Sequence, residues 1–552
     1  MKNYQFLFLV FLFFISCKKK EMPITPPVLP VSFSATTVSL NGSAAMPYKF
    51  VSLSPIIKIG FSAKINTNLI SANVLYNQAN GIAVSYTAST ENGDSILVIR
   101  PASKLVGLTA YSVTVSSGFQ SQQAAVLPAS LTYTFTTGID SVYKFPVITD
   151  SALLTLVQQQ TFKYFWDFGH PTSGLARERN ISGDLVTSGG SGFGIMAIPV
   201  AIKRNFIPRN EGLLRMQKIV GFLKNTAQTF HGAYPHWLNG ISGAVIPFST
   251  KDNGADLVET SYLMEGLLTA RQYFNGTDVM ETTLRSDINF IWNRVEWNWF
   301  RQGNQNTLFW HWSPSYNWEI NLQVKGWNEA LMTYVLAASS NTFSIPKSVY
   351  DNGWAAGNNF LNGNTYLGYI LPLGPALGGP LFFEHYSFMG INPIGLSDGI
   401  TSYSTQTKNH TLINYNYTIA NPKGYYGYSD SVWGLTASDI QGGYTASSPT
   451  NDIGTIAPTA ALSSFPYTPL ESMKALKFFY YVLGDKIWKE YGFVDAFSLN
   501  NLWFANSFLA IDQGPIIVMI ENYRSGQVWN LFTSCPEVKA GLIKLGFTAP
   551  YL

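Results

Sequence analysis

The chain has 552 residues, of which 12% are charged and 15% are aromatic, and its formal net charge is +3. This length predicts two or three domains, and the many aromatic rings exclude a disordered chain. The near balance of 35 basic and 32 acidic residues excludes a basic nucleic-acid surface, and two cysteines are too few for a disulfide scaffold. We therefore expect large, well-packed domains whose neutral polar surface would suit a hydroxyl-rich ligand such as a sugar.

The N-terminus has the features of a secretion signal. Lys2 precedes an apolar run from Phe6 to Ile15, which is too short to span a bilayer. The run ends just before Cys17, as in a bacterial lipobox, so we expect residues 1–16 to be a lipoprotein signal peptide and Cys17 to carry the lipid. The alternative is an ordinary secretory signal that contains a cysteine. A lipid anchor predicts a place in the cell envelope, either periplasmic or at the outer membrane.

The next two segments differ in composition. Residues 17–30 hold three lysines and four prolines, which indicates an extended tether. Residues 31–138 have short alternating apolar runs between turn residues, typical of a small all-β sandwich, with strands expected at 95–100, 110–115 and 131–136. The run LVIRPASKLVGLTAYSVTVSSG resembles bacterial Ig-like domains. We expect an accessory domain, because it holds no paired carboxylates or clustered histidines.

The remaining chain, residues 139–552, is predicted to be mainly α. Apolar residues recur at helical spacing in seven segments, at 153–168, 211–229, 256–274, 279–294, 327–338, 470–483 and 516–523. A β segment at 366–371 is expected to be minor. The four glycines within 189–194 lack the Lys-Ser/Thr of a phosphate loop, so we expect a tight turn that lines a mouth.

The most conspicuous polar residues are three carboxylates at i, i+4 and i+7, namely Asp252, Asp256 and Glu259. If a helix begins near Asn253, they share one face and raise one another's pKa values. Capping and helix-dipole roles would explain Asp252 and Asp256, but they explain Glu259 poorly because its neighbours predict burial. We therefore interpret the three carboxylates as a functional cluster.

A fourth carboxylate, Glu329, begins an apolar helix beside Trp327; the alternative is a capping role. Aromatic residues crowd the segment 309–318, which is either a satellite core or a sugar-stacking platform. The six histidines are scattered and show no HExxH motif, so we expect neither a catalytic metal nor an organic cofactor.

Several motifs together resemble a known family. They occur in consistent order from about residue 150 to about residue 548, and they read TFKYFWDFGHPTSGLARERN, SGGSGFGIMAIPVAIKRNFI, FHGAYPHWLNG, DNGADLVETSYLMEGLLTARQYFNG, GWNEALMTYVLAASS and PLFFEHYSFMGINP. They are similar to the bacterial glucoamylase-like proteins and, more specifically, to glycoside hydrolase family 144, the β-1,2-glucanases. The resemblance implies an (α/α)6 toroid or barrel that hydrolyses β-1,2-glucosidic bonds with inversion. It implies either endo action or exo release of sophorose from β-1,2-linked glucan or glucooligosaccharides.

The family's acidic residues carry over to Asp252, Asp256, Glu259 and Glu329. One departure is Glu178 before Arg179, where family members often have another acidic-Arg pair. Inversion needs one acid and one base, so we assign Glu329 as the general acid and one of the other three as the base, although the roles could be exchanged. Candidate substrate-binding residues are Trp237, His231, His236, Trp310, His311, Trp312, Tyr316, Trp318, Arg179, Glu384, His385 and Trp433.

Two other functions compete with hydrolysis. A non-catalytic glycan-binding lipoprotein of the envelope would share the tether, the Ig-like domain and the aromatic segment, but it would not need four carboxylates. A polysaccharide lyase would need a cationic site for uronates, which the carboxylates disfavour. The sequence leaves endo or exo action and the oligomeric state open.

Overall fold

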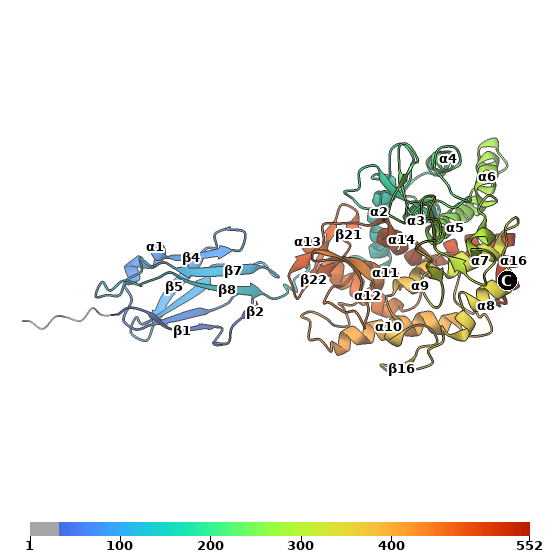
Figure 1. Ribbon diagram of the computed structural model, residues 1–552. Coiled ribbons are helices and arrows are strands. Elements are labelled where there is room, and N and C mark those ends of the chain that lie inside the picture. The colour runs from blue at the N-terminus through green and yellow to red at the C-terminus, as the bar shows by residue number, and fades with distance from the viewer. Residues whose placement is uncertain (1–31) are drawn as a thin grey trace, which may run out of the picture. The chain divides into compact units, whose positions relative to one another are not determined.

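The structure is a computed structural model that describes residues 32–552. The expected signal peptide, the tether and Cys17 lie outside the described residues. The chain divides between Asp140 and Ser141 into two compact units, each of which is described by itself (Figure 1). Among residues 32–552, no helix has both the length and the apolar content needed to cross a membrane.

The N-terminal unit contains two four-stranded sheets. Its strands are β1 (Ala35–Leu40), β2 (Tyr48–Val51), β3 (Ile57–Phe61), β4 (Val74–Gln78), β5 (Tyr86–Glu91), β6 (Ile96–Pro101), β7 (Ala110–Val115) and β8 (Leu131–Thr137), with a short helix α1 (Ile70–Asn73). One sheet has the order β1-β3-β6-β5 and the other the order β2-β8-β7-β4. Alternate residues such as Ile59, Ile99 and Val113 are fully buried in a shared core. The expected small all-β unit is confirmed.

The second unit is mostly helical. Its helices are α2 (Asp150–Trp166), α3 (Ser188–Lys203), α4 (Arg209–Asn225), α5 (Leu257–Tyr273), α6 (Val279–Trp292), α7 (Leu331–Ser339), α8 (Lys347–Asn352), α9 (Phe382–Ser387), α10 (Tyr403–Ala420), α11 (Pro458–Leu462), α12 (Pro469–Lys477), α13 (Gly484–Ile487), α14 (Ala510–Ser525), α15 (Gln527–Thr533) and α16 (Pro536–Leu545). The segment 366–371 is a small hairpin of β16 (Thr365–Tyr366) and β17 (Tyr369–Ile370).

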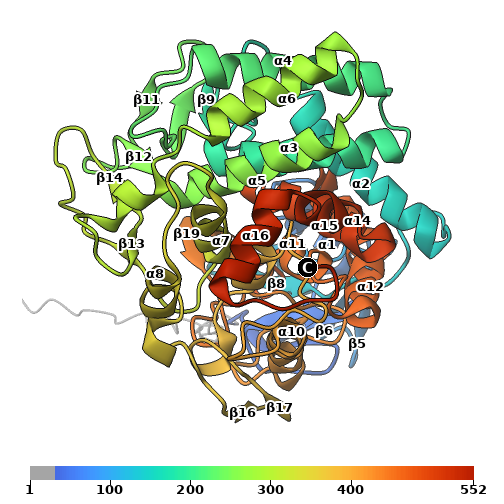
Figure 2. The same cartoon turned by 90° about the vertical axis from the view of Figure 1, so that its right-hand side faces the viewer.

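Some helices of this unit are buried on all sides, whereas others have one apolar face. Helix α7 is buried over its whole length, and α3 and α5 are buried over most of theirs. By contrast, α6 and α16 bury apolar residues only at helical spacing, as expected of outer helices. Figure 2 shows α4 and α6 side by side beyond the packed pair α3 and α5. The core therefore lies among α3, α5, α7 and α14.

The glycine-rich segment does not form the expected tight turn, because it is the first half of α3. A helix this rich in glycine is intrinsically weak, but it can approach its neighbours very closely. A Cβ atom added to Gly192 would lie 2.1 Å from the carbonyl oxygen of Tyr262 in α5, and one on Gly190 would lie 2.6 Å from Ala510 in α14. Tertiary packing thus overrides local propensity here, and it brings the N-terminus of α3 beside α5.

Candidate active site

The carboxylates Asp252, Asp256 and Glu259 lie together, but not on one helical stripe. Helix α5 begins at Leu257, so Asp256 is its N-cap, and the Oδ1 atom accepts a hydrogen bond from the Glu259 backbone N–H at 2.9 Å. Asp252 comes from the preceding loop. The helix therefore does not begin near Asn253. Instead, the loop before α5 folds back and brings Asp252 into the predicted cluster.

A pair of two-residue strands joins this cluster to the aromatic segment. Strand β12 (Ala255–Asp256) pairs with β14 (His311–Trp312), and Asp256 is opposite His311 in the register. The Nε2 atom of His311 lies 3.4 Å from Asp252 Oδ2 and 3.6 Å from Asp256 Oδ2. The segment 309–318 therefore contributes a histidine directly to the acidic cluster.

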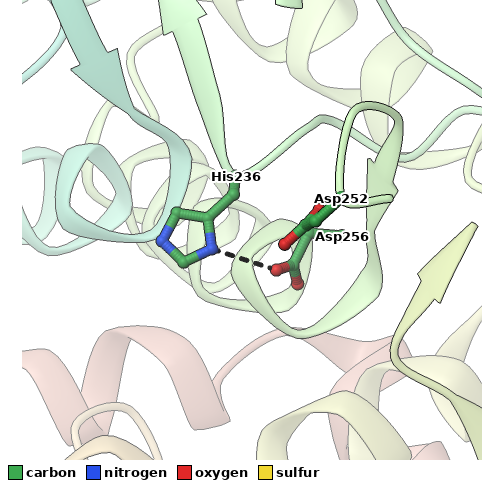
Figure 3. Close-up of side chains that lie close together, drawn as sticks. All are labelled: His236, Asp252 and Asp256. Carbon is green, nitrogen blue, oxygen red and sulfur yellow. Dashed lines mark hydrogen bonds and ion pairs between the residues drawn. The ribbon is translucent and has the colours of Figure 1, made fainter. Parts of the chain in front are cut away.

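A second histidine closes the cluster from the other side. His236 Nδ1 lies 3.2 Å from Asp256 Oδ2, as Figure 3 shows, and His236 Nε2 lies 4.0 Å from Glu259 Oε1. His236 stands just before β10 (Trp237–Asn239), and its side chain is 24% exposed, whereas the side chain of Asp256 is fully buried. Solvent therefore reaches the cluster past His236.

The two histidines decide the charge of Asp256. Burial would raise the pKa of Asp256, but the hydrogen bond from His236 and the charge of His311 outweigh it and hold the pKa below its usual range. Burial would lower the pKa of His236, but Glu259 and Asp256 raise it to about 9. Asp256 is thus an ionised carboxylate between two histidines whose pKa values are raised.

Asp252 and Glu259 hold their protons more tightly than Asp256 does. Burial and the neighbouring Asp256 raise the pKa of Asp252 to about 6. Burial also raises the pKa of Glu259, although the charge of His236 opposes it. The Oε2 atom of Glu259 accepts a hydrogen bond of 2.7 Å from the backbone N–H of Gly189, at the first turn of α3. The close approach of the glycine-rich helix thus fixes this carboxylate.

Glu329 faces the same group of charges. It stands two residues before α7, and its carbonyl oxygen accepts a hydrogen bond of 3.0 Å from the hydroxyl of Tyr262. Burial, together with the charges of Glu259 and Asp256, raises the pKa of the Glu329 carboxyl to about 7. This carboxyl can therefore carry a proton near neutral pH, as a general acid must.

The cluster also has the donors of a metal site. His236, Asp252 and Asp256 each place one ligand atom within 4.8 Å of the others (Figure 3). Histidine and carboxylate together suit zinc and similar cations. Protonated His236 and His311 offset the negative charge of the carboxylates as a metal ion would. The geometry is therefore consistent with a bound cation or with two protonated histidines.

Several aromatic residues surround the cluster, one of which the sequence did not reveal. Phe248 is 50% exposed, and its ring lies 4.3 Å from the ring of His236 at an interplanar angle of 26°. The predicted Trp237 packs against Phe248 at 4.7 Å. The ring of Trp310 stacks beside that of His311. One face of Phe248 therefore covers a histidine of the cluster, and the ring is half exposed to solvent.

The aromatic segment 309–318 also builds a satellite core. Trp312 and Trp318 pack against Trp299, a residue outside the predicted site, with ring centroids 5.4 and 4.7 Å apart. Tyr316 is exposed on the same loop. His231 pairs with a carboxylate outside the candidate cluster. Its Nδ1 atom lies 2.9 Å from Glu296 Oε2.

Three predicted binding residues are buried where they cannot touch a substrate. Trp433 is fully buried and donates through Nε1 to the carbonyl oxygen of Glu471. Glu384 is fully buried beside His410, with which it forms a 2.8 Å pair, and His385 is buried against a serine hydroxyl. Their predicted contact with substrate was wrong, because each side chain is buried and bonds to another group inside the protein.

Arg179 belongs to a second acidic cluster that the sequence did not reveal. It forms ion pairs of 2.9 Å with Glu178 and 3.3 Å with Asp439. The backbone N–H of Asp439 donates to Asp495, and burial together with the charge of Asp495 raises the pKa of Asp512. Two buried carboxyl groups that interact in this way disfavour double ionisation, so the pair of Asp495 and Asp512 holds a proton.

Burial is the main cause of this proton sharing. It raises the pKa of Asp495 to about 7 and that of Asp512 still further. The second cluster also neighbours the first. Tyr386 donates a hydrogen bond to the carbonyl of Ile511, next to Asp512, and its ring lies 5.8 Å from that of Tyr262, which bonds Glu329.

Family models match both units of the chain. Residues 321–536 match the Glycoamylase model, which describes glucoamylase-like proteins, and residues 34–137 match the model of the bacterial Ig-like domain. The chain is 46% identical over 421 residues to the exo β-1,2-glucooligosaccharide sophorohydrolase (non-reducing end) of Parabacteroides distasonis. That match covers 72% of this chain and 58% of the relative, so the chain spans less than two thirds of the relative's length.

Two solved structures are also similar. The endo-β-1,2-glucanase of Chitinophaga pinensis is 49% identical, with a TM-score of 0.72 over 74% of this chain and 100% of that one. The β-1,2-glucanase of Parabacteroides distasonis is 37% identical, with a TM-score of 0.71 over 94% of this chain and 73% of that one. The family resemblance of the motifs is thereby confirmed. The chain belongs to the glucoamylase-like proteins of glycoside hydrolase family 144.

Proposed function

We propose that the protein is an inverting glycoside hydrolase that cleaves β-1,2-glucosidic bonds in β-1,2-glucan or its oligosaccharides. The observation that carries the proposal is the contrast between Glu329, whose pKa is raised to about 7, and Asp256, which stays ionised nearby. Two carboxyl groups whose pKa values are pushed apart are what acid–base cleavage of a glycoside requires. The relatives named for β-1,2-glucan give the linkage.

Glu329 is the general acid in this mechanism. Its carboxyl protonates the glycosidic oxygen as the bond breaks, and the charges of Glu259 and Asp256 keep the proton on it until then. Those same charges stabilise the positive charge that develops on the sugar ring. Glu329 is then recharged with a proton from solvent.

The base must be ionised and must reach a water molecule on the other side of the sugar, roughly 6.5–9.5 Å from the acid. Asp256, Glu259 and Asp252 remain candidates, and the ionised Asp256 is the first of them. The pair of Asp495 and Asp512 is a second source, because a shared proton with a pKa near neutrality can be accepted and released readily. Separate amide replacements of Asp256 and Asp512 distinguish the two sources.

We also propose that the helical unit is an (α/α)6 barrel. The alternation of fully buried helices such as α3, α5 and α7 with one-sided helices such as α6 and α16 supports an inner and an outer helical ring. In such a barrel, the loops before the inner helices gather at one end. Asp256 and Glu329 both stand just before a fully buried helix, which supports a site at that end of the proposed barrel.

The cellular location is a separate proposal, with a lipid anchor at Cys17 and a place in the cell envelope. It rests on the apolar run and on the small residue before Cys17. Mass spectrometry of the mature N-terminus tests it. A diacylated Cys17 is expected, and release of an unmodified chain by ordinary signal cleavage would contradict it.

The direct test of the activity is incubation with linear β-1,2-glucan, followed by measurement of new reducing ends. The wild-type protein should release them without added metal, and Glu329→Gln should not. Binding of the glucan with no release of reducing ends would instead identify a glycan-binding protein. An ultraviolet-absorbing unsaturated product would identify a lyase.

A further inference from the structure

A polar groove lies beside the candidate active site and takes no part in the mechanism above. It consists of two cavities of about 410 and 540 Å³, which share Glu296 and Phe343 in their walls. We call it the Trp299 groove after the ring that lines the first cavity; Trp318 lines the same cavity, and His231 lines the second. Each volume exceeds that of one sugar ring and falls in the range of small-molecule sites.

The wall of this groove is held in a strained conformation. His231 has a φ of 52°, which non-glycine residues rarely adopt, and the following Gly232 has a φ of 73°. A Cβ atom on Gly232 would lie 2.0 Å from the carbonyl oxygen of Arg294, so no other residue fits there. The backbone N–H of Glu296 binds the carbonyl of His231 at 3.0 Å. Such strain persists where the surroundings enforce it, commonly at ligand sites.

The aromatic floor is equally fixed. The ring of His231 stacks on Trp299 at 3.5 Å with an interplanar angle of 11°, and Glu296 holds the imidazole through Nδ1 at 2.9 Å. Trp312 packs edge-on against both rings. The groove is therefore pre-organised, which reduces the entropy lost when a ligand binds.

Polar groups of the wall lack partners within the protein. Among the described residues, the side chain of Asn298 makes no hydrogen bond, and Oδ1 of Asn293 is buried without a donor. Glu296 can accept further hydrogen bonds, and Arg294 is exposed at the rim. Amide and carboxylate groups beside indole rings match a neutral sugar, whose hydroxyls both donate and accept. One arginine facing one carboxylate gives no charge preference for an anionic ligand.

The groove lies against the strand pair that carries part of the acidic cluster. In the paired strands β12 and β14, Asp256 is opposite His311, whereas the next residue, Trp312, packs against Trp299 and His231. One glycan chain can therefore contact both sides of this strand pair. We infer that the Trp299 groove is a distal subsite that binds glucose units of a long β-1,2-glucan away from the bond that is cleaved; this inference rests on the proposed function.

The test compares long and short substrates. The double variant Glu296→Gln/Asn298→Ala removes a charge and an amide but preserves the His231–Trp299 stack. For two lost hydrogen bonds, KM for β-1,2-glucan should rise about tenfold, with kcat changed less than about twofold. KM for the shortest oligosaccharide that the wild type cleaves should stay unchanged. Glu490→Gln, an exposed carboxylate outside the groove, is the matched control.

An unchanged KM for the polymer, or an equal rise for both substrates, would overturn the inference while leaving the activity intact. Calorimetry with β-1,2-glucan on Glu329→Gln, with and without the two groove substitutions, separates the two claims. If the wild type releases no reducing ends, the proposed function fails. Calorimetry still tests the groove in that case. Binding of β-1,2-glucan that is about tenfold weaker after the two substitutions supports the inference, and equal binding, or no binding by either variant, overturns it.

Discussion

The two acidic clusters of the helical unit both consist of buried carboxyl groups, but they have different cations, and only the first holds a carboxylate whose pKa is lowered. In the first cluster, two histidines with raised pKa values face Asp256 and keep it ionised. In the second, one guanidinium, that of Arg179, bonds Glu178 and Asp439, so Asp495 and Asp512 share a proton instead. Burial raises the pKa values of the carboxyl groups in both clusters, and the number and position of the cations decide which carboxylate stays ionised in spite of it.

The largest effect is expected for Glu329→Gln, which removes the general acid. Without it, a base from either cluster has no partner that protonates the leaving oxygen. Loss of a general acid typically costs about 10²–10⁴-fold in rate, so kcat on β-1,2-glucan should fall by that factor. Thermal unfolding should stay close to wild type, because the amide has the same shape. Near-normal turnover would remove Glu329 from the mechanism.

The next effect contrasts the clusters directly. Asp256→Asn leaves two histidines beside a neutral amide, and loss of one member of a buried ion pair should cost roughly 3 kcal/mol of stability at neutral pH. Asp512→Asn removes a carboxyl that resists ionisation. Because the pKa of Asp512 is raised in the folded state, wild-type stability is lost as pH rises above the unfolded value of 3.8.

Denaturant unfolding between pH 4 and 8 checks both variants. Asp512→Asn should be closest to wild type at pH 4 and gain stability relative to it towards pH 8. Equal destabilisation by the two variants at every pH would show that the clusters do not differ in the proposed way.

A smaller effect concerns His236, whose pKa is raised to about 9. The stability that its positive charge contributes is fully present below pH 6.5 and is lost as pH rises through 9. The free energy of unfolding of the wild type should therefore fall by up to about 3 kcal/mol across that window, and His236→Gln should abolish most of this dependence. If the free energy of unfolding depends on pH equally in the variant and the wild type, another group causes the dependence.

The smallest effect is expected for Phe248, whose ring covers His236 on one face. Loss of one aromatic contact with a sugar should raise KM for β-1,2-glucan about fivefold in Phe248→Ala, with little change in kcat, and Phe248→Trp should restore it. Tyr523→Ala, a similarly exposed ring on α14, is the control. An unchanged KM in Phe248→Ala would show that the ring only shields the histidine.

Much of the fold could be predicted from periodicity, because α2, α4, α5 and α6 each carry a clear apolar repeat. Helix α3 could not, because its glycines lower helix propensity and only contacts with α5 and α14 explain them. Spacing alone could not place Asp252, because it reaches the cluster through a loop rather than through a shared helical face.

The second cluster shows a more general limit. Glu178, Asp439, Asp495 and Asp512 come from segments far apart in the chain, and only Glu178 stands in a recognisable motif. The tertiary fold brings them together. Conversely, Glu384 and Trp433 belong to conspicuous sequence runs but are buried, where Glu384 pairs with His410 and Trp433 donates to a backbone carbonyl.

Proton NMR of the first products from β-1,2-glucan distinguishes inversion from retention at the cleaved bond. If an acid and a distant base cleave the β-linked substrate by inversion, the new reducing ends are α-anomers that convert to the equilibrium mixture over minutes. We expect the α-anomeric H1 signal to appear first and the β signal to follow. Initial release of the β-anomer would contradict the account, because it would require a covalent intermediate and a different role for the ionised Asp256.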